Sequence, residues 1–361
     1  MRPPRVLIFT VDIGAGHDLP AELLSEAIAE RSPGAEVTVA DGLTAMGRVA
    51  VALGRTGAET ILQHGRPLFE LQYWLLSRVT PTRRLAGRSL TAVGGPGLLA
   101  LIERTRPDAI VSTYPGTTEV LGRLRASGRL RVPCAAVITD LAALRFWAHP
   151  GIDLHLVTHG ESIAEVRAIA GARADIRHVR GFTRPEYEAP PTRAEARAAL
   201  GLPEDGPIVA VSGGGWGIGD LEQAARTALA IPDVTVVCLC GTNAKLRARF
   251  DAMATGGRLR TEGFTARMCD WLSAADVLVH STAGLTVLEA ELCGTWAISY
   301  GWGVGHIRIN NAAYRRFGLA DVATTQAELA AALRRALSAP RRRDGSYARL
   351  PAAADAVLEL T

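Results

Sequence analysis

One histidine stands in a short glycine-containing loop near the start of the chain, between an apolar run and a helical pattern. The stretch reads IFTVDIGAGHDLPAELLSEAIAE over residues 8–30, and the histidine is His17. An imidazole has an unperturbed pKa of about 6.5, so it can accept a proton at neutral pH. Open α/β sheets bind ligands at such strand-to-helix junctions, and we therefore predict a chemical role for His17. The alternative is a solvent-facing histidine in a tight turn.

A second candidate site is the glycine cluster in VAVSGGGWGIGD, residues 209–220. The cluster follows an apolar run, and backbone without side chains lets a ligand approach amide N–H groups closely. The GxGxxG spacing of dinucleotide-binding loops occurs neither here nor at residues 14–16. We predict instead a loop that faces a phosphate or an acceptor, built on Gly213, Gly214 and Gly215.

A third candidate site lies in ADVLVHSTAGLTVLEAELCG, residues 275–294. A strand is expected to end at His280, and the small residues after it open a helix whose unpaired N–H groups and dipole favour an anion. Glu289 follows Gly284 by five residues, which is about one and a half helical turns. A carboxylate there can accept hydrogen bonds from both hydroxyls of a ribose. A solvated surface glutamate is the alternative.

The composition excludes several classes of protein. The net charge is +4 over 361 residues and no basic stripe is interleaved with aromatics, so we expect no nucleic-acid partner. Lys245 is the single lysine and follows Ala244, which excludes a P-loop. The five cysteines form no CxxC pair and are expected to be reduced core residues. No Asp-x-Asp pair or ligand-spaced histidine cluster predicts a metal site.

No targeting or membrane-spanning segment is predicted. The apolar run at residues 6–11 is too short for a signal peptide. No stretch approaches the roughly 20 apolar residues of a membrane span. The expected location is the cytoplasm, with the inner face of the membrane as a candidate surface.

Short apolar runs that alternate with helical patterns predict an α/β fold of two doubly wound parallel sheets. We predict an N-terminal domain at 1–183, a linker at 184–206, a second domain at 207–335 and a helical tail at 336–361. Ligands bind beyond the carboxyl ends of such strands, so the functional loops of both domains are expected to face a cleft. The predicted strands are residues 6–10, 36–40, 109–112, 135–139, 154–158, 208–212, 235–239, 259–262, 277–280 and 297–300.

With these loops identified, the chain resembles the glycosyltransferases that include monogalactosyldiacylglycerol synthase and processive diacylglycerol glucosyltransferase, a family 28-like group. VDIGAGH is similar to the family's Asp-x-Gly-Gly-Gly-His loop. VITDL, GGGWGIGD, CGTN, GFTARMCDWLSAADVLV and AGLTVLEA follow in the family's order, up to about Ala323. Each motif is short, and their common order makes the resemblance specific.

The resemblance implies a GT-B fold and an inverting hexosyltransferase. The second domain would hold the nucleotide-sugar donor, with UDP as the favoured nucleotide, and the first would hold the acceptor. The UDP-sugar would be a co-substrate, and no further cofactor is implied. By the matching positions, Phe264 would cover the base, backbone near Arg267 and Met268 would bond its edge, and Glu289 would hold the ribose. The diphosphate would lie at Ser281, Thr282, Ala283 and Gly284, further donor contacts at Leu285, Thr286, His306 and Asn310, and acceptor contacts at Gly14, Ala15, Gly16 and Trp74.

The chain also departs from the family pattern at four places. His306 and Ile307 stand where relatives carry Gln-Glu facing the sugar, which leaves the hexose open. Ser281 replaces a Lys or Arg of the diphosphate loop, and Pro20 replaces a Ser of the first helix. The His that usually follows the TDL stretch is replaced at Leu144 or Arg145.

Three side chains are candidates for the base that an inverting transfer needs. His17 is favoured, because it lies on a loop expected to face the acceptor. It could instead donate a hydrogen bond to the donor phosphate or to a sugar hydroxyl. Asp12 and Asp140 end strands at the same edge and are alternative bases or orienters of His17, unless they only cap their strands.

The acceptor side contains an apolar and basic segment. PLFELQYWLLSRV, residues 67–79, lies within residues 48–90, where arginines far outnumber Glu59 and Glu70. Aromatic and aliphatic groups bordered by arginines suit the headgroup region of an anionic membrane. The acceptor is then a lipid, diacylglycerol-like, or another apolar small molecule. The alternative is a core helix whose arginines form a solvated edge.

Three other functions stay open. A nucleotide-sugar 2-epimerase shares the architecture and the UDP site, although the long segment 43–100 resembles an acceptor-side insertion. A soluble natural-product glycosyltransferase would use another nucleotide sugar. A non-catalytic nucleotide-binding protein would explain Ser281 and Ile307.

Overall fold

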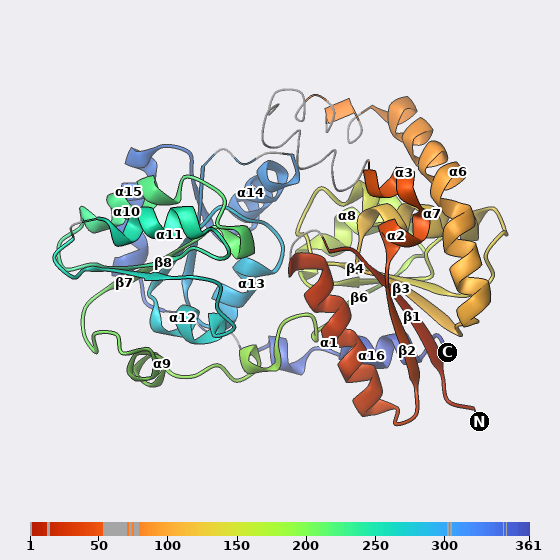
Figure 1. The fold of residues 1–361 in the computed structure, drawn as a ribbon, viewed down its shortest axis with the longest axis horizontal. Helices are drawn as coiled ribbons and strands as arrows, with labels where there is room; N and C mark the ends of the chain where they lie inside the picture. The colour runs from red at the N-terminus through yellow and green to blue at the C-terminus, as the bar shows by residue number, and fades with distance from the viewer. Residues whose placement is uncertain are drawn as a thin grey trace. The chain divides into compact units, whose positions relative to one another are not determined.

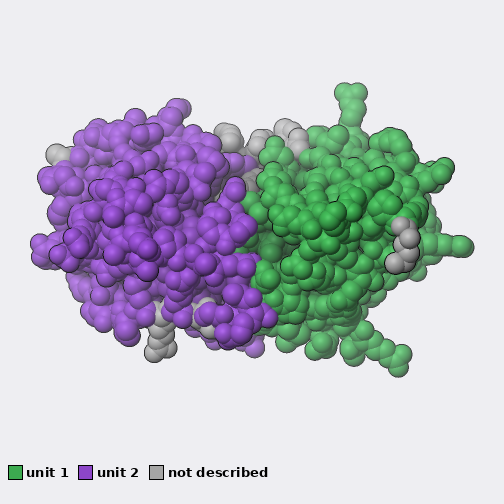
Figure 2. All heavy atoms as spheres, turned by 90° about the horizontal axis from the view of Figure 1, so that it is seen from below, with its two compact units in different colours: residues 1–183, 350–361 green, residues 184–349 purple. Residues whose placement is uncertain are grey.

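Two parallel β-sheets, one in each of two units, organise the described part of the chain in the computed structural model (Figure 1). The first unit consists of residues 1–183 and 350–361, and the second of residues 184–349 (Figure 2). The structure describes residues 2–12, 15–52, 71, 74–75, 79–253, 255–301, 303, 305–341, 343 and 345–361, without the side chain of Ala15.

The first sheet has the strand order β2-β1-β3-β4-β5-β6, with all neighbouring pairs parallel. The direction of strand addition reverses between β1 and β3, so the loops after these strands lie at a switch point where such folds bind ligands. The apolar runs do not predict β6, because its sequence DIRH is polar and partly exposed at the sheet edge. The strands are β1 (Arg5–Thr10), β2 (Glu36–Asp41), β3 (Ala109–Ser112), β4 (Cys134–Ile138), β5 (Leu154–Val157) and β6 (Asp175–His178).

Helices cover both faces of this sheet (Figure 1). Alternate residues of a strand point to opposite faces, so Val6 and Ile8 pack beneath α1 and α16 while Leu7 and Phe9 pack beneath α2, α6 and α7. Burial on both faces explains the nearly continuous apolar strands. The helices are α1 (Ala15–Arg31), α2 (Gly42–Met46), α3 (Arg48–Val51), α6 (Thr80–Thr105), α7 (Pro115–Ala126), α8 (Ile163–Ala170) and α16 (Ala353–Leu358), with short 3-10 turns η2 (Leu144–Phe146) and η3 (Gly160–Ser162).

The sequence predicts no membrane-spanning segment, but helix α6 is long and apolar enough to span a membrane by length and composition alone. The mean hydropathy of its most apolar window is 1.3, and 28% of that window is buried. One face of α6 nevertheless packs within the first unit. A Cβ added at Gly94 would lie 2.7 Å from Met46 Cγ, and one at Gly97 would lie 2.0 Å from the Ala45 carbonyl oxygen. The glycines therefore allow close packing of α6 on α2.

The second sheet has the order β12-β11-β10-β7-β8-β9 and is also parallel throughout. Its switch point lies between β7 and β10, which places the glycine cluster beside residues 281–284. Only the three-residue edge strand β12 is not predicted by an apolar run. The strands are β7 (Ile208–Ser212), β8 (Thr235–Leu239), β9 (Leu259–Glu262), β10 (Val277–His280), β11 (Trp296–Tyr300) and β12 (Asp321–Ala323).

The helices of the second unit follow the expected alternation. Helices α10 and α15 pack with α11 on one face of the sheet, around Val209, Val211 and Phe250. The helices are α9 (Arg193–Leu200), α10 (Leu221–Leu229), α11 (Ala244–Asp251), α12 (Met268–Ala274), α13 (Leu285–Leu292), α14 (His306–Phe317) and α15 (Gln326–Ser338), with 3-10 turns η4 (Pro185–Tyr187), η5 (Gly214–Trp216) and η6 (Tyr347–Arg349).

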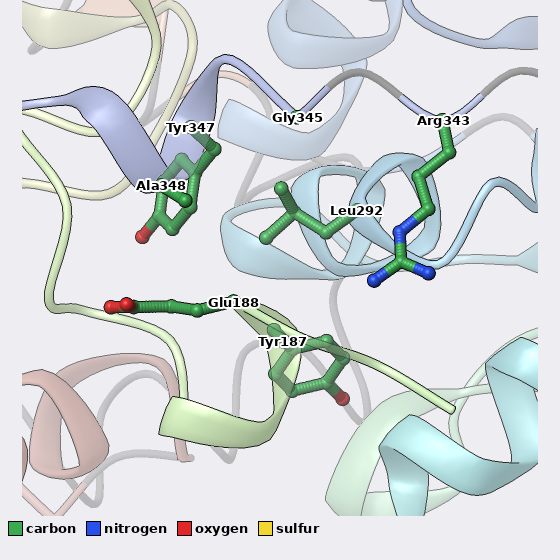
Figure 3. A pocket seen from close by; sticks show the side chains of 7 residues that line it. All are labelled: Tyr187, Glu188, Leu292, Arg343, Gly345, Tyr347 and Ala348. Carbon is green, nitrogen blue, oxygen red and sulfur yellow. The ribbon is translucent and has the colours of Figure 1, made fainter. Parts of the chain in front are cut away.

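Residues expected in the linker at 184–206 and in the tail at 336–361 pack together in the second unit. Tyr187 and Glu188 line a small pocket of about 80 Å³ with Leu292 of α13 and with Arg343, Gly345, Tyr347 and Ala348 of the tail (Figure 3). The predicted tail is shared between the two units. Its last residues, 350–361, belong to the first unit, where Asp355 pairs with Arg31 of α1 at 2.6 Å.

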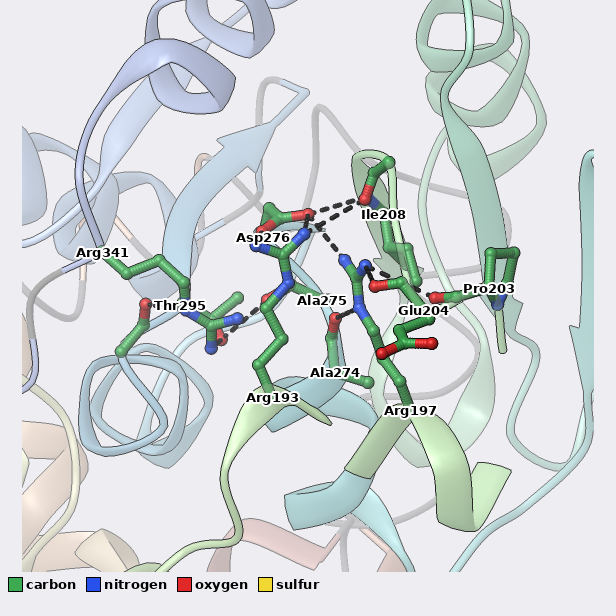
Figure 4. A network of polar contacts seen from close by, with 12 residues as sticks. Arg193, Arg197, Pro203, Glu204, Ile208, Ala274, Ala275, Asp276, Thr295 and Arg341 are labelled. Carbon is green, nitrogen blue, oxygen red and sulfur yellow. Dashed lines mark hydrogen bonds and ion pairs between the residues drawn. The ribbon is translucent and has the colours of Figure 1, made fainter. Parts of the chain in front are cut away.

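The remainder of the expected linker is fixed by a buried guanidinium. Arg197 of α9, whose side chain is 1% exposed, donates to Asp276 Oδ2 at 3.0 Å and to the carbonyl oxygen of Ala274 at 3.0 Å (Figure 4). Asp276 also accepts from the backbone N–H of Ile208 at 2.8 Å. A buried charge requires such partners, so α9 is bonded to the starts of β7 and β10. Polar composition suggests a linker, whereas the structure places residues 184–206 in the second unit.

Candidate active site

The His17 imidazole is held in one tautomer by a carbonyl group. His17 lies in the first turn of α1, and its Nδ1 is 2.9 Å from the carbonyl oxygen of Thr113, which follows β3. A carbonyl oxygen only accepts, so Nδ1 carries the proton and donates it. The basic lone pair of the neutral ring is then on Nε2. The switch point between β1 and β3 brings these two loops together.

Two aromatic rings enclose this imidazole. The Tyr114 ring centre is 5.4 Å from that of His17 in an edge-on arrangement, and the Trp147 ring centre is 5.5 Å away with the planes tilted by 35°. Sequence reasoning did not single out Thr113, Tyr114 or Trp147. The position of residues 113–114 directly after a predicted strand could have indicated the first two.

The other predicted residues of the first unit are spread around this loop. Gly14 lies outside the described residues, Ala15 begins α1, and Gly16 and Asp12 are exposed. Asp140 is 7% exposed, and its Oδ2 accepts a hydrogen bond from Trp147 Nε1 at 3.2 Å. The structure therefore places Asp140 against the indole rather than in a hydrogen bond to His17.

The glycine cluster of the second unit forms a loop closed by its own backbone. The N–H of Gly217 donates to Gly214 at 3.0 Å, and the N–H of Thr242 donates to the carbonyl oxygen of Gly215 at 2.8 Å. Gly217 has φ +59°, and a Cβ there would lie 2.3 Å from the carbonyl oxygen of Cys240. Only glycine permits this approach of two backbones. The CGTN motif thus supports the glycine loop after β7.

The predicted diphosphate loop is anchored by two side chains. The Ser281 hydroxyl donates to the carbonyl oxygen of Ile218 in the glycine loop, so it is already engaged within the protein. The N–H of Thr282 donates to His280 Nδ1 at 3.3 Å. Burial lowers the pKa of His280 to about 4, which keeps the ring neutral and able to accept that bond. Ala283 and Gly284 complete the turn before α13, with Gly284 at φ +76°.

An exposed aromatic ring stands beside the glycine loop. Phe264 is 70% exposed, and a Cβ on Gly215 would lie 3.8 Å from its ring. Such a ring offers a flat face to a planar base. The N–H of Arg267 donates to Thr265 Oγ1 at 3.0 Å, so that group is used within the loop. Met268 begins α12 directly after it.

Glu289 is a half-buried carboxyl on α13 that makes no side-chain hydrogen bond to any other described residue. Burial, chiefly, raises its pKa to about 8, with nearby Cys293 adding to the shift and Arg184 opposing it. A carboxyl in this state lacks the donors that would stabilise its charge. Its oxygens can therefore accept hydrogen bonds from the hydroxyl groups of a ligand.

The remaining predicted donor residues lie at the starts of α13 and α14. Leu285 is buried, and Thr286 Oγ1 accepts from the Thr282 hydroxyl at 3.1 Å. His306 is exposed at the first position of α14, and buried Asn310 donates to its carbonyl oxygen at 2.9 Å. Among the described residues, no group of three or more His, Cys, Asp or Glu is arranged to hold a metal ion.

Two units with doubly wound six-strand parallel sheets define the GT-B fold of glycosyltransferases. The structure of the glycosyltransferase SnogD from Streptomyces nogalater is similar, with a TM-score of 0.59 at 19% identity over 99% of this chain and 98% of that chain. The fold class predicted from the sequence is confirmed.

Sequence comparison gives a narrower likeness. Residues 17–179 match the family described as monogalactosyldiacylglycerol (MGDG) synthase. The chain is 28% identical over 324 residues to monogalactosyldiacylglycerol synthase 1 of Arabidopsis thaliana, covering 84% of this chain and 59% of the relative. It is 22% identical over 298 residues to processive diacylglycerol beta-glucosyltransferase of Bacillus licheniformis, covering 82% of this chain and 76% of the relative. The chain thus spans under two thirds of the plant relative's length, and the predicted resemblance is confirmed.

The raised pKa of Glu289 predicts a pH-dependent stability. The unfolded carboxyl titrates at 4.5 and the folded one at about 8, so the folded chain holds a proton that the unfolded chain has lost between these values. Stability should therefore fall as pH rises from about 4.5 through 8. We expect Glu289→Gln, which cannot ionise, to raise the thermal midpoint of the ligand-free protein at pH 8.5 and to leave it nearly unchanged at pH 4.5.

Differential scanning fluorimetry across this range measures the effect. Glu291→Gln, at an exposed position of the same helix, is the matched control. An identical pH profile for both variants would contradict the assignment.

Proposed function

We propose that the protein is an inverting glycosyltransferase that moves a hexose from a UDP-sugar to a hydroxyl of a diacylglycerol-like lipid or another apolar small molecule. The observation that carries the proposal is the His17 tautomer, with Nδ1 bonded to Thr113 and the basic lone pair on Nε2. The sequence relatives support the reaction class, since their names describe a galactosyl and a glucosyl transfer to diacylglycerol.

In this proposal the second unit holds the donor. Phe264 covers the uracil, the turn before α13 binds the diphosphate, and Glu289 accepts hydrogen bonds from the ribose hydroxyls. The amide groups of that turn and the helix dipole of α13 would stabilise the negative charge of the leaving UDP. The UDP-sugar acts as a co-substrate, and the chemistry needs no further cofactor.

The transfer requires one proton movement. The acceptor oxygen forms a bond to the anomeric carbon on the face opposite the diphosphate, and the bond from that carbon to the diphosphate oxygen breaks. The acceptor proton passes to Nε2 of His17, which becomes an imidazolium and later returns the proton to water. Attack on the opposite face inverts the anomeric centre.

Two alternatives make different products. A nucleotide-sugar 2-epimerase would release the epimerised nucleotide sugar and would form no glycosylated acceptor. A non-catalytic binding protein would bind UDP and release nothing. The relatives in sequence are named as transferases, which favours the proposed reaction.

Replacement of His17 tests the transferase directly. With UDP-galactose or UDP-glucose and vesicles that contain dioleoylglycerol, the wild-type chain should release UDP faster than without the lipid. His17→Ala should lower this rate by about 10²–10⁴, while UDP still binds because its site lies in the second unit.

UDP release and mass spectrometry of the lipid products are the measurements. Unchanged release in His17→Ala would place the base elsewhere. Epimerised nucleotide sugar without transfer would favour the alternative enzyme.

The proposed acceptor side includes a basic and apolar surface on the first unit. Leu85 is 64% exposed and lies on α6 between exposed Arg84 and Arg88, and Trp74 is 53% exposed. Apolar groups with arginines suit an anionic membrane surface. Of the segment quoted above, Phe69, Tyr73, Leu76 and Arg78 lie outside the described residues, as do Arg55 and Arg66. We propose a peripheral attachment to the cytoplasmic face of the membrane.

A charge reversal tests this attachment. The wild-type protein should float with vesicles of anionic phospholipid at low salt and less so at high salt, because screening weakens the attraction. The double variant Arg84→Glu, Arg88→Glu should float less under both conditions.

The control is Arg129→Glu, Arg131→Glu, an equal change of charge at exposed positions before β4. Equal flotation of both double variants, or no flotation of the wild type at low salt, would contradict the membrane proposal. A soluble acceptor would then be favoured.

A further inference from the structure

A tryptophan connects a buried carboxylate to the imidazole of His17. The indole Nε1 of Trp147 donates to Asp140 Oδ2 at 3.2 Å, while the indole ring centre lies 5.5 Å from the His17 ring centre. Asp140 makes no other side-chain hydrogen bond to a described residue, although it is 7% exposed. A buried carboxylate whose hydrogen-bond partner is one indole N–H is unusual, since burial of a charge is costly without several partners.

The turn that carries Trp147 is bonded to residues 162 and 165 of the first unit. Ala143 adopts φ +68°, a left-handed conformation that costs a non-glycine residue about 1–2 kcal/mol. The turn is bonded on both sides of this residue. The Ser162 hydroxyl donates to the carbonyl oxygen of Leu141 at 3.0 Å, and the N–H of Leu144 donates to Glu165 Oε1 at 3.1 Å. This path brings the chain back, so that Trp147 bonds Asp140 seven residues before it.

Packing fixes the indole as well. Trp147 is 5% exposed and belongs to a core cluster with Ile138, Leu144, Val157 and Val166. The ring that lies against His17 is therefore part of the core and not a mobile surface group. Strain at Ala143 together with a buried carboxylate suggests that this arrangement serves more than packing.

We propose that Trp147 is a positioning residue for His17 and that Asp140 acts on His17 through the indole. The Trp147 ring holds the imidazole in place and stabilises the imidazolium that forms when His17 takes the acceptor proton. The Asp140 carboxylate, bonded to the indole N–H, increases the electron density of the ring that lies against the cation. The inference rests on the proposed function, in which His17 is the base.

The distance fits an interaction of a cation with an aromatic ring. Such contacts operate within about 6 Å of the ring centre, and tryptophan gives the strongest ones. The usual energies correspond to a roughly 2- to 30-fold preference for the charged form, or a pKa higher by roughly 0.3 to 1.5. The charged or titratable groups on the elements around His17 include Asp12, Asp18 and Glu22 of the first loop and helix α1, Tyr114 with nearby Asp41, Glu119 of α7, and Arg145.

A set of conservative variants separates the roles of the ring, the N–H and the charge. Trp147→Phe keeps an aromatic ring and removes the N–H, whereas Trp147→Leu removes the ring. Asp140→Asn keeps an acceptor for the indole and removes the charge. Phe146→Leu removes a neighbouring, half-buried ring of the same turn and is the matched control.

The measurement is the pKa of His17 in the full-length protein, from the pH titration of its imidazole signals by NMR. The missing signal in His17→Gln assigns the resonance. We expect Trp147→Leu to lower the measured pKa by roughly 0.3 to 1.5, Trp147→Phe and Asp140→Asn to lower it less, and Phe146→Leu to leave it unchanged. Asp140→Asn added to Trp147→Phe should have no further effect, because the N–H link is already absent.

The outcomes distinguish the inference from its rivals. If Trp147→Phe and Asp140→Asn both leave the pKa of His17 unchanged, the indole only packs against His17 and the inference is wrong. If Asp140→Asn lowers the pKa equally in both backgrounds, the carboxylate acts directly and not through Trp147. The titration needs no substrate, so it stands apart from the UDP-release assay: shifted pKa values with an inactive wild type would refute the proposed function alone.

Discussion

Parallel strands place the loops that follow them at one edge of the sheet, and this constraint determines where chemistry can occur in each unit. In the first sheet the order reverses between β1 and β3, and the loops after these strands meet in the bond from His17 to the Thr113 carbonyl oxygen. In the second sheet it reverses between β7 and β10, and there the Ser281 hydroxyl bonds the glycine loop. The candidate site of each unit is thus a consequence of its strand order.

The groups at these switch points are held in defined protonation and hydrogen-bonding states. Burial keeps His280 neutral, so that it can accept from the loop before α13. Burial raises the pKa of the Glu289 carboxyl to about 8. His280 Nδ1 organises the loop, while its Nε2 is buried without a hydrogen-bond partner among the described residues. Both groups lie in the second unit, where we propose that the donor binds.

The sequence predicts buried features well, because parallel strands covered on both faces leave uninterrupted apolar runs. Strands β7 to β10 agree with their predicted limits, and the doubly wound parallel sheet of the second unit follows from them. Edge strands β6 and β12 carry no such signal, being partly exposed. Residues 184–206 look like a linker by composition, since nothing local shows that Arg197 finds a distant partner in Asp276.

The sequence predicts only those residues of the candidate site that a local sequence pattern marks. Helix starts and glycine runs indicate loops, and they identified His17, residues 281–284 and Glu289. The contact of His17 with Trp147 depends on the turn through Ala143, which no pattern in the sequence reveals. The hydrogen bond from the Ser281 hydroxyl to the Ile218 carbonyl oxygen joins residues distant in sequence, so no local pattern predicts it. The assigned roles of these residues stay predictions.

We propose that the second unit binds a uridine nucleotide through Glu289, and calorimetric titration of UDP into the full-length protein measures this binding. The wild-type protein should bind UDP saturably. Glu289→Ala removes the hydrogen bonds between this carboxyl and the two ribose hydroxyls, worth together about 1–3 kcal/mol, so its affinity should be lower by about tenfold or more with the fold intact. UDP binding of equal strength in Glu289→Ala would show that Glu289 does not hold the ribose, and no binding by the wild-type protein would rule out a uridine-nucleotide site.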